Sequence, residues 1–241
     1  MNNLVYVINP NSNATVTAAI DVACAPLRSQ NGPPITCLTL ADGPPAIESQ
    51  RDADGVVTPL LRQAALLEEN AAAFVIACFS DPGLYSLREQ SRHPVLGISE
   101  CAALTALTMG RLFGVISILP ASVARHLRYF GAMGVLDRLA ADLPVGLGVA
   151  ELADEARTFS RMVSVGERLR DAHHADVLVM GCAGMARYRA PLEQSLAIPV
   201  VEPTQAAVVM ALGRVRLGWG QRSSAAPGAD SGSSPLELRR A

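Results

Sequence analysis

The chain has 241 residues, half of them hydrophobic and few of them aromatic, and its formal net charge at pH 7 is −2. This length supports a buried core in one large or two small α/β domains, and the lack of a basic run argues against a nucleic-acid partner. No window holds about 18 uninterrupted apolar residues, and the amino terminus has no basic start before a long apolar core, so we expect neither a membrane span nor a signal peptide.

Two residue types narrow the chemistry. The chain has no lysine, which excludes the lysine Schiff base of pyridoxal-phosphate enzymes, a lysine-dependent aldolase and a P-loop. Its five cysteines form an odd set without C-x-x-C spacing, which indicates a reduced, cytoplasmic protein. No His, Cys and carboxylate residues have metal-ligand spacing, so we expect no metal and no cofactor.

The first half of the chain is predicted to alternate strands with helices. The predicted strands cover residues 4–8, 35–40, 72–77 and 94–98. The predicted helices cover residues 15–27, 56–70 and 82–91, and another helix opens at Ser99 and Glu100. Asp81 followed by Pro82 indicates an N-cap with proline at the first helical position.

The same order then restarts. Strands are predicted at residues 112–117, 144–149, 177–180 and 199–202, with a turn at 119–122 and a long helix at 151–172. Residues 94–107 also align with 199–212 through matching prolines, valines, alanines and a leucine. We therefore predict an α/β fold of two pseudosymmetric half-domains, each with a mostly parallel four-stranded sheet flanked by helices, and an active site in the cleft between them.

One cysteine follows a buried strand in each half. Cys78 and Cys182 both lie at the carboxyl end of an apolar run, where open α/β sheets bind ligands, and Cys182 stands in a loop of small residues. If these ends face each other, a thiolate on one face of a substrate carbon and a thiol on the other form a two-base pair that inverts the carbon. Loop N–H groups and the side chains of Asn9, Asn11 and Ser80 are candidate donors to the enolate.

Three motifs closely resemble those of hydantoin racemases, in the aspartate/glutamate racemase superfamily. They read I-N-P-N-S at 8–12, A-C-F-S-D-P-G at 77–83 and G-C-A-G-M at 181–185, and weaker matches lie at 43–49, 94–100 and 115–122. The resemblance runs from about residue 4 to residue 212. It implies Cys78 and Cys182 as the acid/base pair and a small-molecule substrate, a 5-substituted hydantoin or allantoin.

The resemblance and the motif loops also indicate which residues bind substrate and where the domains divide. The expected substrate-binding residues are Asn9, Asn11, Glu48, Phe79, Ser80, Ser117, Ile118, Ala183 and Gly184. Residues 1–98 with 207–217 are expected to form the first half-domain and residues 99–206 the second. We expect a homo-oligomer, and a disordered tail at 218–241 because this segment is rich in Gly, Ser, Ala and Pro.

The chain departs from the family pattern on the expected pocket side. Ser117 and Ile118 stand where hydantoin racemases usually carry two threonines, and S-Q-R-D follows Glu48 where a glycine and an aromatic-containing stretch are expected. A buried substrate group that loses its hydrogen-bond partner costs about 1–3 kcal/mol. The ring or its substituent is therefore expected to differ.

Four alternative functions stay open at this point. They are an amino-acid racemase, a maleate-type isomerase or an arylmalonate-type decarboxylase of the same superfamily, and a two-lobed binding protein without activity. The pair of cysteines argues against the decarboxylase, which keeps one, and the absence of arginine from the motif loops favours a neutral ring over a charged amino acid. His93 and His126 are isolated in the sequence, and Cys24, Cys37 and Cys101 are interpreted as thiols without a partner.

Overall fold

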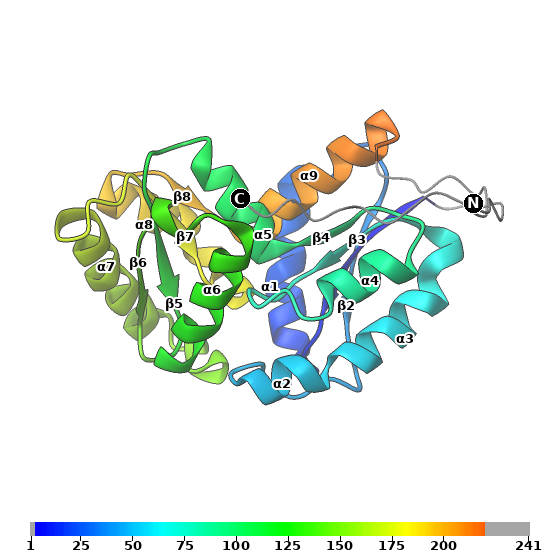
Figure 1. Ribbon diagram of the computed structural model, residues 1–241, viewed down its shortest axis with the longest axis horizontal. Coiled ribbons are helices and arrows are strands. Elements are labelled where there is room, and N and C mark those ends of the chain that lie inside the picture. The colour runs from blue at the N-terminus through cyan, green and yellow to red at the C-terminus, as the bar shows by residue number, and fades with distance from the viewer. Residues whose placement is uncertain (1–2, 220–241) are drawn as a thin grey trace, which may run out of the picture.

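The computed structural model describes residues 3–219, which form two four-stranded sheets with every strand pair parallel. The sheets lie side by side as two lobes flanked by helices (Figure 1). Both sheets have the same strand order relative to the chain, β2-β1-β3-β4 in one and β6-β5-β7-β8 in the other. The predicted fold of two pseudosymmetric α/β half-domains is therefore confirmed.

The first part of the chain builds the first sheet. Its strands are β1 (Leu4–Asn9), β2 (Ile35–Thr39), β3 (Ala71–Ile76) and β4 (Val95–Gly97). Its helices are α1 (Ala14–Cys24), α2 (Gln50–Gly55), α3 (Val57–Leu67), α4 (Leu84–Gln90) and α5 (Ile98–Leu107). Short 3-10 helices extend α1 and α3, as η1 (Ala25–Leu27) and η2 (Glu68–Asn70).

The second part repeats the pattern. Its strands are β5 (Phe113–Ser117), β6 (Leu139–Pro144), β7 (Val177–Met180) and β8 (Val200–Val201). Its helices are α6 (Pro120–Met133), α7 (Glu155–Asp171), α8 (Arg189–Leu196) and α9 (Pro203–Leu217). The 3-10 helices are η3 (Leu136–Arg138), η4 (Val149–Ala153) and η5 (Ala183–Tyr188).

Helices cover both faces of the sheets, which is why the inner strands are continuous apolar runs. Every residue of β3, β5 and β7 is buried. Successive side chains of a strand point to opposite faces, so Val5 and Val7 of β1 join the core that continues into the second half. Tyr6 lies on the other face and stacks on Phe74, in a smaller core.

Three helices join the two halves. α1 packs on η5, and α5 packs on β5, β7 and β8 as well as on β4. α9, orange in Figure 1, packs on β1, β3 and β4 of the first sheet and against α1 and α5. The chain thus returns to the first sheet after β8, although the division into 1–98 with 207–217 and 99–206 remains a prediction.

Asp81 does not cap the helix that follows it, and the sequence prediction at this point is wrong. Its backbone has φ of 42°, and α4 starts only at Leu84 behind Gly83. The Asp81 carboxylate instead accepts hydrogen bonds from the backbone N–H groups of Ser99 at 3.0 Å and Glu100 at 2.8 Å, at the start of α5. A carboxylate is stabilised at a helix N-terminus by unpaired N–H groups and the helix dipole.

The second half places a carboxylate at the equivalent helix start by another route. Glu202 is itself the N-cap of α9, and its carboxylate accepts from the N–H groups of Thr204 and Gln205. Glu202 aligns with Gly97, whose missing side chain leaves the space that the Asp81 carboxylate fills. The two halves therefore satisfy the same helix start with acids from different points of the chain.

The strand predicted at 144–149 is wrong. The strand that completes the second sheet beside β5 is β6, at Leu139–Pro144, and it ends before Val145. Gly146, with φ of 72°, and η4 occupy the predicted range. β6 is a partly exposed edge strand rich in alanine, so its composition carried little strand signal.

The other predicted boundaries differ less from those in the structure. The helix predicted at 151–172 begins at Glu155, because Asp154 caps it, and α6 extends the turn predicted at 119–122. Of the expected disordered tail, Gly218 ends α9 in a left-handed conformation, and residues 220–241 lie outside the described residues. Within residues 3–219 no helix has the length and apolarity needed to cross a membrane.

Gly97→Ala is expected to destabilise the protein, because a Cβ at this position would lie 2.3 Å from the Asp81 carboxylate. Overpacking of this kind costs about 1–3 kcal/mol. The free energy of unfolding in urea measures the loss. Gly213→Ala in α9, where an added Cβ meets nothing within 4 Å, is the control and should be neutral or stabilising. Equal stability of the two variants would contradict the assigned role of Gly97.

Candidate active site

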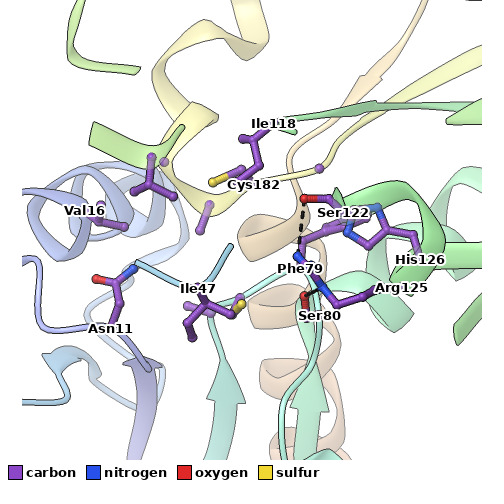
Figure 2. Close-up of a pocket in the computed structure, with 16 residues that line it drawn as sticks. Asn11, Val16, Ile47, Phe79, Ser80, Ile118, Ser122, Arg125, His126 and Cys182 are labelled. Atoms are coloured by element: carbon purple, nitrogen blue, oxygen red, sulfur yellow. Dashed lines mark hydrogen bonds between the residues drawn. The ribbon is translucent and has the colours of Figure 1, made fainter. Parts of the chain in front are cut away.

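A cleft lies at the carboxyl ends of the inner strands of both sheets. Its walls include residues 77–80 after β3 and residues 181–184 after β7. The other lining residues are Asn11, Val16, Ile47, Ile118, Ser122, Arg125, His126 and Val149. Figure 2 shows Asn11 and Val16 on one side of this cleft and Arg125 and His126 on the other. The cleft is thus built from both halves.

Cys78 and Cys182 line this one cleft from corresponding positions, each two residues beyond the end of its strand. Gly181, just before Cys182, passes so close to β5 that an added Cβ would lie 2.8 Å from the carbonyl oxygen of Ile116. This close approach requires glycine and sets the direction in which the loop leaves the strand. The repeated strand-and-loop unit therefore brings one thiol from each half to the same space.

Both thiols are held protonated at neutral pH by their surroundings. Burial raises the pKa of the Cys78 thiol to about 12 and that of the Cys182 thiol to about 11. Backbone N–H groups work in the opposite direction, from Ser80 toward Cys78 and from Gly184 toward Cys182, and Arg125 also lowers the pKa of Cys78. A thiolate formed here is a strong base with a donor already in place.

Two buried acids stand beside the two thiols. Burial raises the pKa of Asp81 to about 7 and that of Glu202 to about 7, although each carboxylate accepts two backbone N–H bonds. Negative charge on Asp81 raises the pKa of Cys78, and negative charge on Glu48 and, to a smaller extent, on Glu202 raises that of Cys182. Each half thus couples one helix-capping acid to one thiol.

Six of the nine residues expected to bind substrate lie in the cleft wall. They are Asn11, Phe79, Ser80, Ile118, Ala183 and Gly184. Asn11 Oδ1 is occupied by Asn9 Nδ2 and by the N–H of Asn13, which leaves the amide nitrogen of Asn11 as the group available to a ligand. Their roles in binding remain predictions.

The other three, Asn9, Glu48 and Ser117, are not among the residues that line the cleft. Glu48 Oε1 accepts from the N–H of Val149 at 2.8 Å and so ties the first half to the second. Asn9 and Ser117, at the ends of β1 and β5, are fully buried in separate polar networks. In this structure these side chains make their hydrogen bonds within the protein.

The two networks occupy equivalent places. Asn9 Nδ2 donates to Thr17 Oγ1 of α1, which lies 2.6 Å from Thr39 Oγ1 at the end of β2.

Ser117 Oγ donates to the carboxylate of Asp142 in β6, whose other oxygen lies 2.7 Å from His126 Nδ1 of α6. His126 is not isolated, as its sequence context suggested, but buried and paired. Its ring contacts the ring of Phe79 edge-to-face, with 5.0 Å between centroids. Both residues line the cleft, so the network helps to fix the position of this part of the wall.

Arg125 is a site residue that sequence reasoning missed. It lies in α6, outside the cysteine loops, and its guanidinium reaches back to the first half, where Nη1 donates to the carbonyl of Glu48 at 3.0 Å. The dipeptide Arg125-His126 in the helix that follows β5, eight residues after the strand ends, was the available signal. An arginine does therefore line the cleft, and its absence from the motif loops no longer argues for a neutral substrate.

Residues 5–211 match the family model described as Asp/Glu/Hydantoin racemase. The chain belongs to this family. The protein is accordingly an isomerase, a racemase by family.

Individual relatives agree with the family match over most of their length. The chain is similar to the hydantoin racemase of Paenarthrobacter aurescens, with 32% identity over 219 residues, 89% of this chain and 92% of the relative. It is 33% identical to the hydantoin racemase of Rhizobium meliloti over 221 residues, 86% of each. The solved allantoin racemase from Klebsiella pneumoniae superposes with a TM-score of 0.86 at 26% identity, covering 97% of this chain and 96% of that one.

The remaining cysteines of this racemase lie outside the cleft. Cys101 is buried in α5. Cys24 and Cys37 are not without partners, since their thiols hydrogen-bond to each other, and this bond raises the pKa of Cys37. Among the described residues, no group of His, Cys, Asp and Glu side chains is arranged to hold a metal ion.

Alkylation tests the thiol environment. Because the pKa of Cys78 is raised to about 12 and that of Cys182 to about 11, their reaction with iodoacetamide should still accelerate with pH above 9.5. An ordinary thiol levels off near its pKa of about 8.5. Mass spectrometry of each cysteine peptide gives the rates, and the urea-unfolded protein is the control. An alkylation rate that levels off below pH 8 in the folded protein would contradict the raised pKa values of the two thiols.

Asp142→Ala is expected to lower the free energy of unfolding by about 2–5 kcal/mol, because it leaves the buried hydroxyl of Ser117 and ring nitrogen of His126 without their acceptor. Urea unfolding measures the change. Asp137→Ala, at an exposed position next to the same strand, should stay within about 0.5 kcal/mol of the parent. Similar free energies of unfolding for the two variants would contradict a stabilising role for the network of Ser117, His126 and Asp142.

Proposed function

We propose that the protein is a cofactor-independent racemase of 5-substituted hydantoins or allantoin, with Cys78 and Cys182 as the two bases. The observation that carries the proposal is the position of the two thiols, at matching points of the two halves and in one cleft. The similarity to hydantoin racemases and to an allantoin racemase supports the substrate class.

The proposed reaction conserves the number of protons on the enzyme. The thiolate of one cysteine removes the proton of the carbon beside the carbonyl, and the electron pair of the broken C–H bond forms an enolate. The thiol of the other cysteine then gives its proton to the opposite face of that carbon. The product has inverted configuration, and the two sulfurs have exchanged protonation states, so the enzyme is ready for the reverse reaction.

The cleft offers groups for each step. The N–H groups of Ser80 and Gly184 face the two sulfurs and stabilise whichever thiolate is formed. The free amide nitrogen of Asn11 is placed to donate to a ring carbonyl as it becomes an enolate. Apolar side chains such as Ile47 and Ile118 exclude water from the reacting carbon.

The same proposal carries the finer predictions about context. We propose that the protein works in the cytoplasm on a small molecule, as a homo-oligomer and without nucleic acid. The near-neutral charge supports the absence of a nucleic-acid partner, and the cysteine pattern supports the cytoplasmic location.

Exchange of the substrate α-proton in deuterated water distinguishes a racemase from a two-lobed binding protein. We expect exchange with racemisation for at least one of a panel of 5-substituted hydantoins and allantoin. Exchange that occurs only with aspartate or glutamate, or isomerisation of maleate to fumarate without exchange, would move the function to another member of the superfamily. Binding without exchange of any substrate would contradict the proposal.

Cys78→Ser and Cys182→Ser should each lower racemisation by about two to four orders of magnitude, because a hydroxyl is a far weaker acid than a thiol. Each variant keeps one competent base, so it should still exchange the α-proton of one enantiomer without inverting it, and the two variants should act on opposite enantiomers. Chiral chromatography with proton NMR in deuterated water reads both rates. Cys37→Ser, on β2, is the matched control and should keep the parent rate. Near-parent racemisation by either cleft variant would rule out the two-base assignment.

A further inference from the structure

Arg125 is a buried cation without an anionic partner. The residue is only 8% exposed, and it lines the cleft. None of the ion pairs formed within residues 3–219 includes it, whereas the partly buried Arg88 lies against Glu100. Asp52 acts on it electrostatically without forming an ion pair. Burying an uncompensated charge is costly, so this arrangement calls for an explanation.

The contacts of Arg125 orient its guanidinium without neutralising it. Nη1 donates to the carbonyls of Glu48 at 3.0 Å and Ala121 at 3.1 Å, and Nη2 donates to Ser122 Oγ at 3.3 Å. Nε lies 3.5 Å from Ser80 Oγ. Figure 2 shows the two hydroxyls on opposite sides of the Arg125 guanidinium. All four acceptors are neutral, and one hydrogen of Nη2 is still available to another acceptor.

This fixed orientation uses both halves of the molecule. Glu48 and Ser80 belong to the first half, and Ala121, Ser122 and Arg125 itself belong to the second. A planar guanidinium held at several points loses little freedom when it binds, and it matches the geometry of a carboxylate. The electrostatic effect of Arg125 on Cys78 places its charge close to one of the two thiols.

We propose that Arg125 forms an anion subsite that binds a carboxylate on the ring substituent of the substrate. This inference rests on the proposed function and narrows it to hydantoins with acidic substituents. The substrate carboxylate would supply the missing counter-charge in a site of low polarity, where a charge-assisted hydrogen bond is strong. Binding there would hold the substituent at Arg125 and present the adjacent ring carbon to the thiols.

The test compares two nearly isosteric hydantoins, 5-carboxymethylhydantoin and 5-carbamoylmethylhydantoin, which differ in charge. In the parent enzyme we expect kcat/KM for racemisation to favour the acid by roughly tenfold or more, the effect of one hydrogen bond to a charged group. In Arg125→Gln the acid-to-amide ratio should fall to about one, and in Arg125→Lys it should lie between. Arg128→Gln, at an exposed position on the same helix where the side chain donates to Gln50, is the control and should keep the parent ratio.

Because a ratio within one variant cancels any loss of folded protein, a destabilised Arg125→Gln still gives an answer. A parent ratio near one, or a ratio unchanged in Arg125→Gln, would overturn the subsite. A fall in kcat/KM by the same factor for both substrates, with an alkaline shift of the pH profile, would also overturn it and show that Arg125 acts on the Cys78 thiolate.

Calorimetric titration separates this proposal from the function on which it rests. The parent should bind the acid more tightly than the amide, and Arg125→Gln should lose this preference, whether or not either compound is racemised. A preserved charge preference without racemisation or α-proton exchange of any hydantoin would leave the anion subsite standing and refute the racemase proposal. Racemisation of neutral hydantoins without a charge preference in binding would support the racemase proposal and refute the anion subsite.

Discussion

Loss of hydration is the main influence on the ionisation of the two cleft thiols, of the two acids beside them and of Arg125. The same apolar surroundings raise the pKa of the thiols of Cys78 and Cys182 and that of the carboxyls of Asp81 and Glu202. Burial acts in the opposite direction on a cation and lowers the pKa of Arg125. The site therefore favours the neutral forms of its acids, and it stabilises charge only where the fold has already positioned a hydrogen-bond donor. The backbone N–H groups behind the two sulfurs are such donors.

The two halves repeat their geometry more faithfully than their chemistry. Both sheets have one strand order, and both bring a cysteine to the cleft two residues beyond a buried strand. The acid at the following helix start comes from the loop as Asp81 in one half, into the space left by Gly97, and from the cap position as Glu202 in the other. The two halves can use different residues in this way because a carboxylate stabilises a helix N-terminus from whichever position in the chain brings it there.

The walls of the cleft differ most strongly, as expected for a site that must recognise a substrate without twofold symmetry. On one side, the Asn9 network behind Asn11 presents an amide. On the other, α6 presents a guanidinium at Arg125 and keeps His126 against Asp142. An amide donor suits a ring carbonyl, whereas a guanidinium suits an anionic substituent, so the proposed substrate would meet a different kind of donor on each wall.

The sequence by itself determined the elements that depend on local pattern. Buried strands appear as continuous apolar runs, so β1, β3, β5 and β7 and the order of the two halves could be predicted, and the cysteine motifs pointed to the family. β6 could not be found, because an edge strand needs little apolar character, and Gly146 and Val149 resembled a strand although they form a turn and a 3-10 helix.

Only the tertiary structure decided which side chains meet. Asp81 was predicted to cap its own helix and caps α5 instead, since a carboxylate binds whichever free N–H groups packing brings close. Ser117, His126 and Asp142 lie up to 25 positions apart and carry no joint motif, yet they form one buried network. Arg125 reaches the cleft from 77 positions beyond Glu48, because the interface between the halves, which no local pattern encodes, turns its side chain toward the first half.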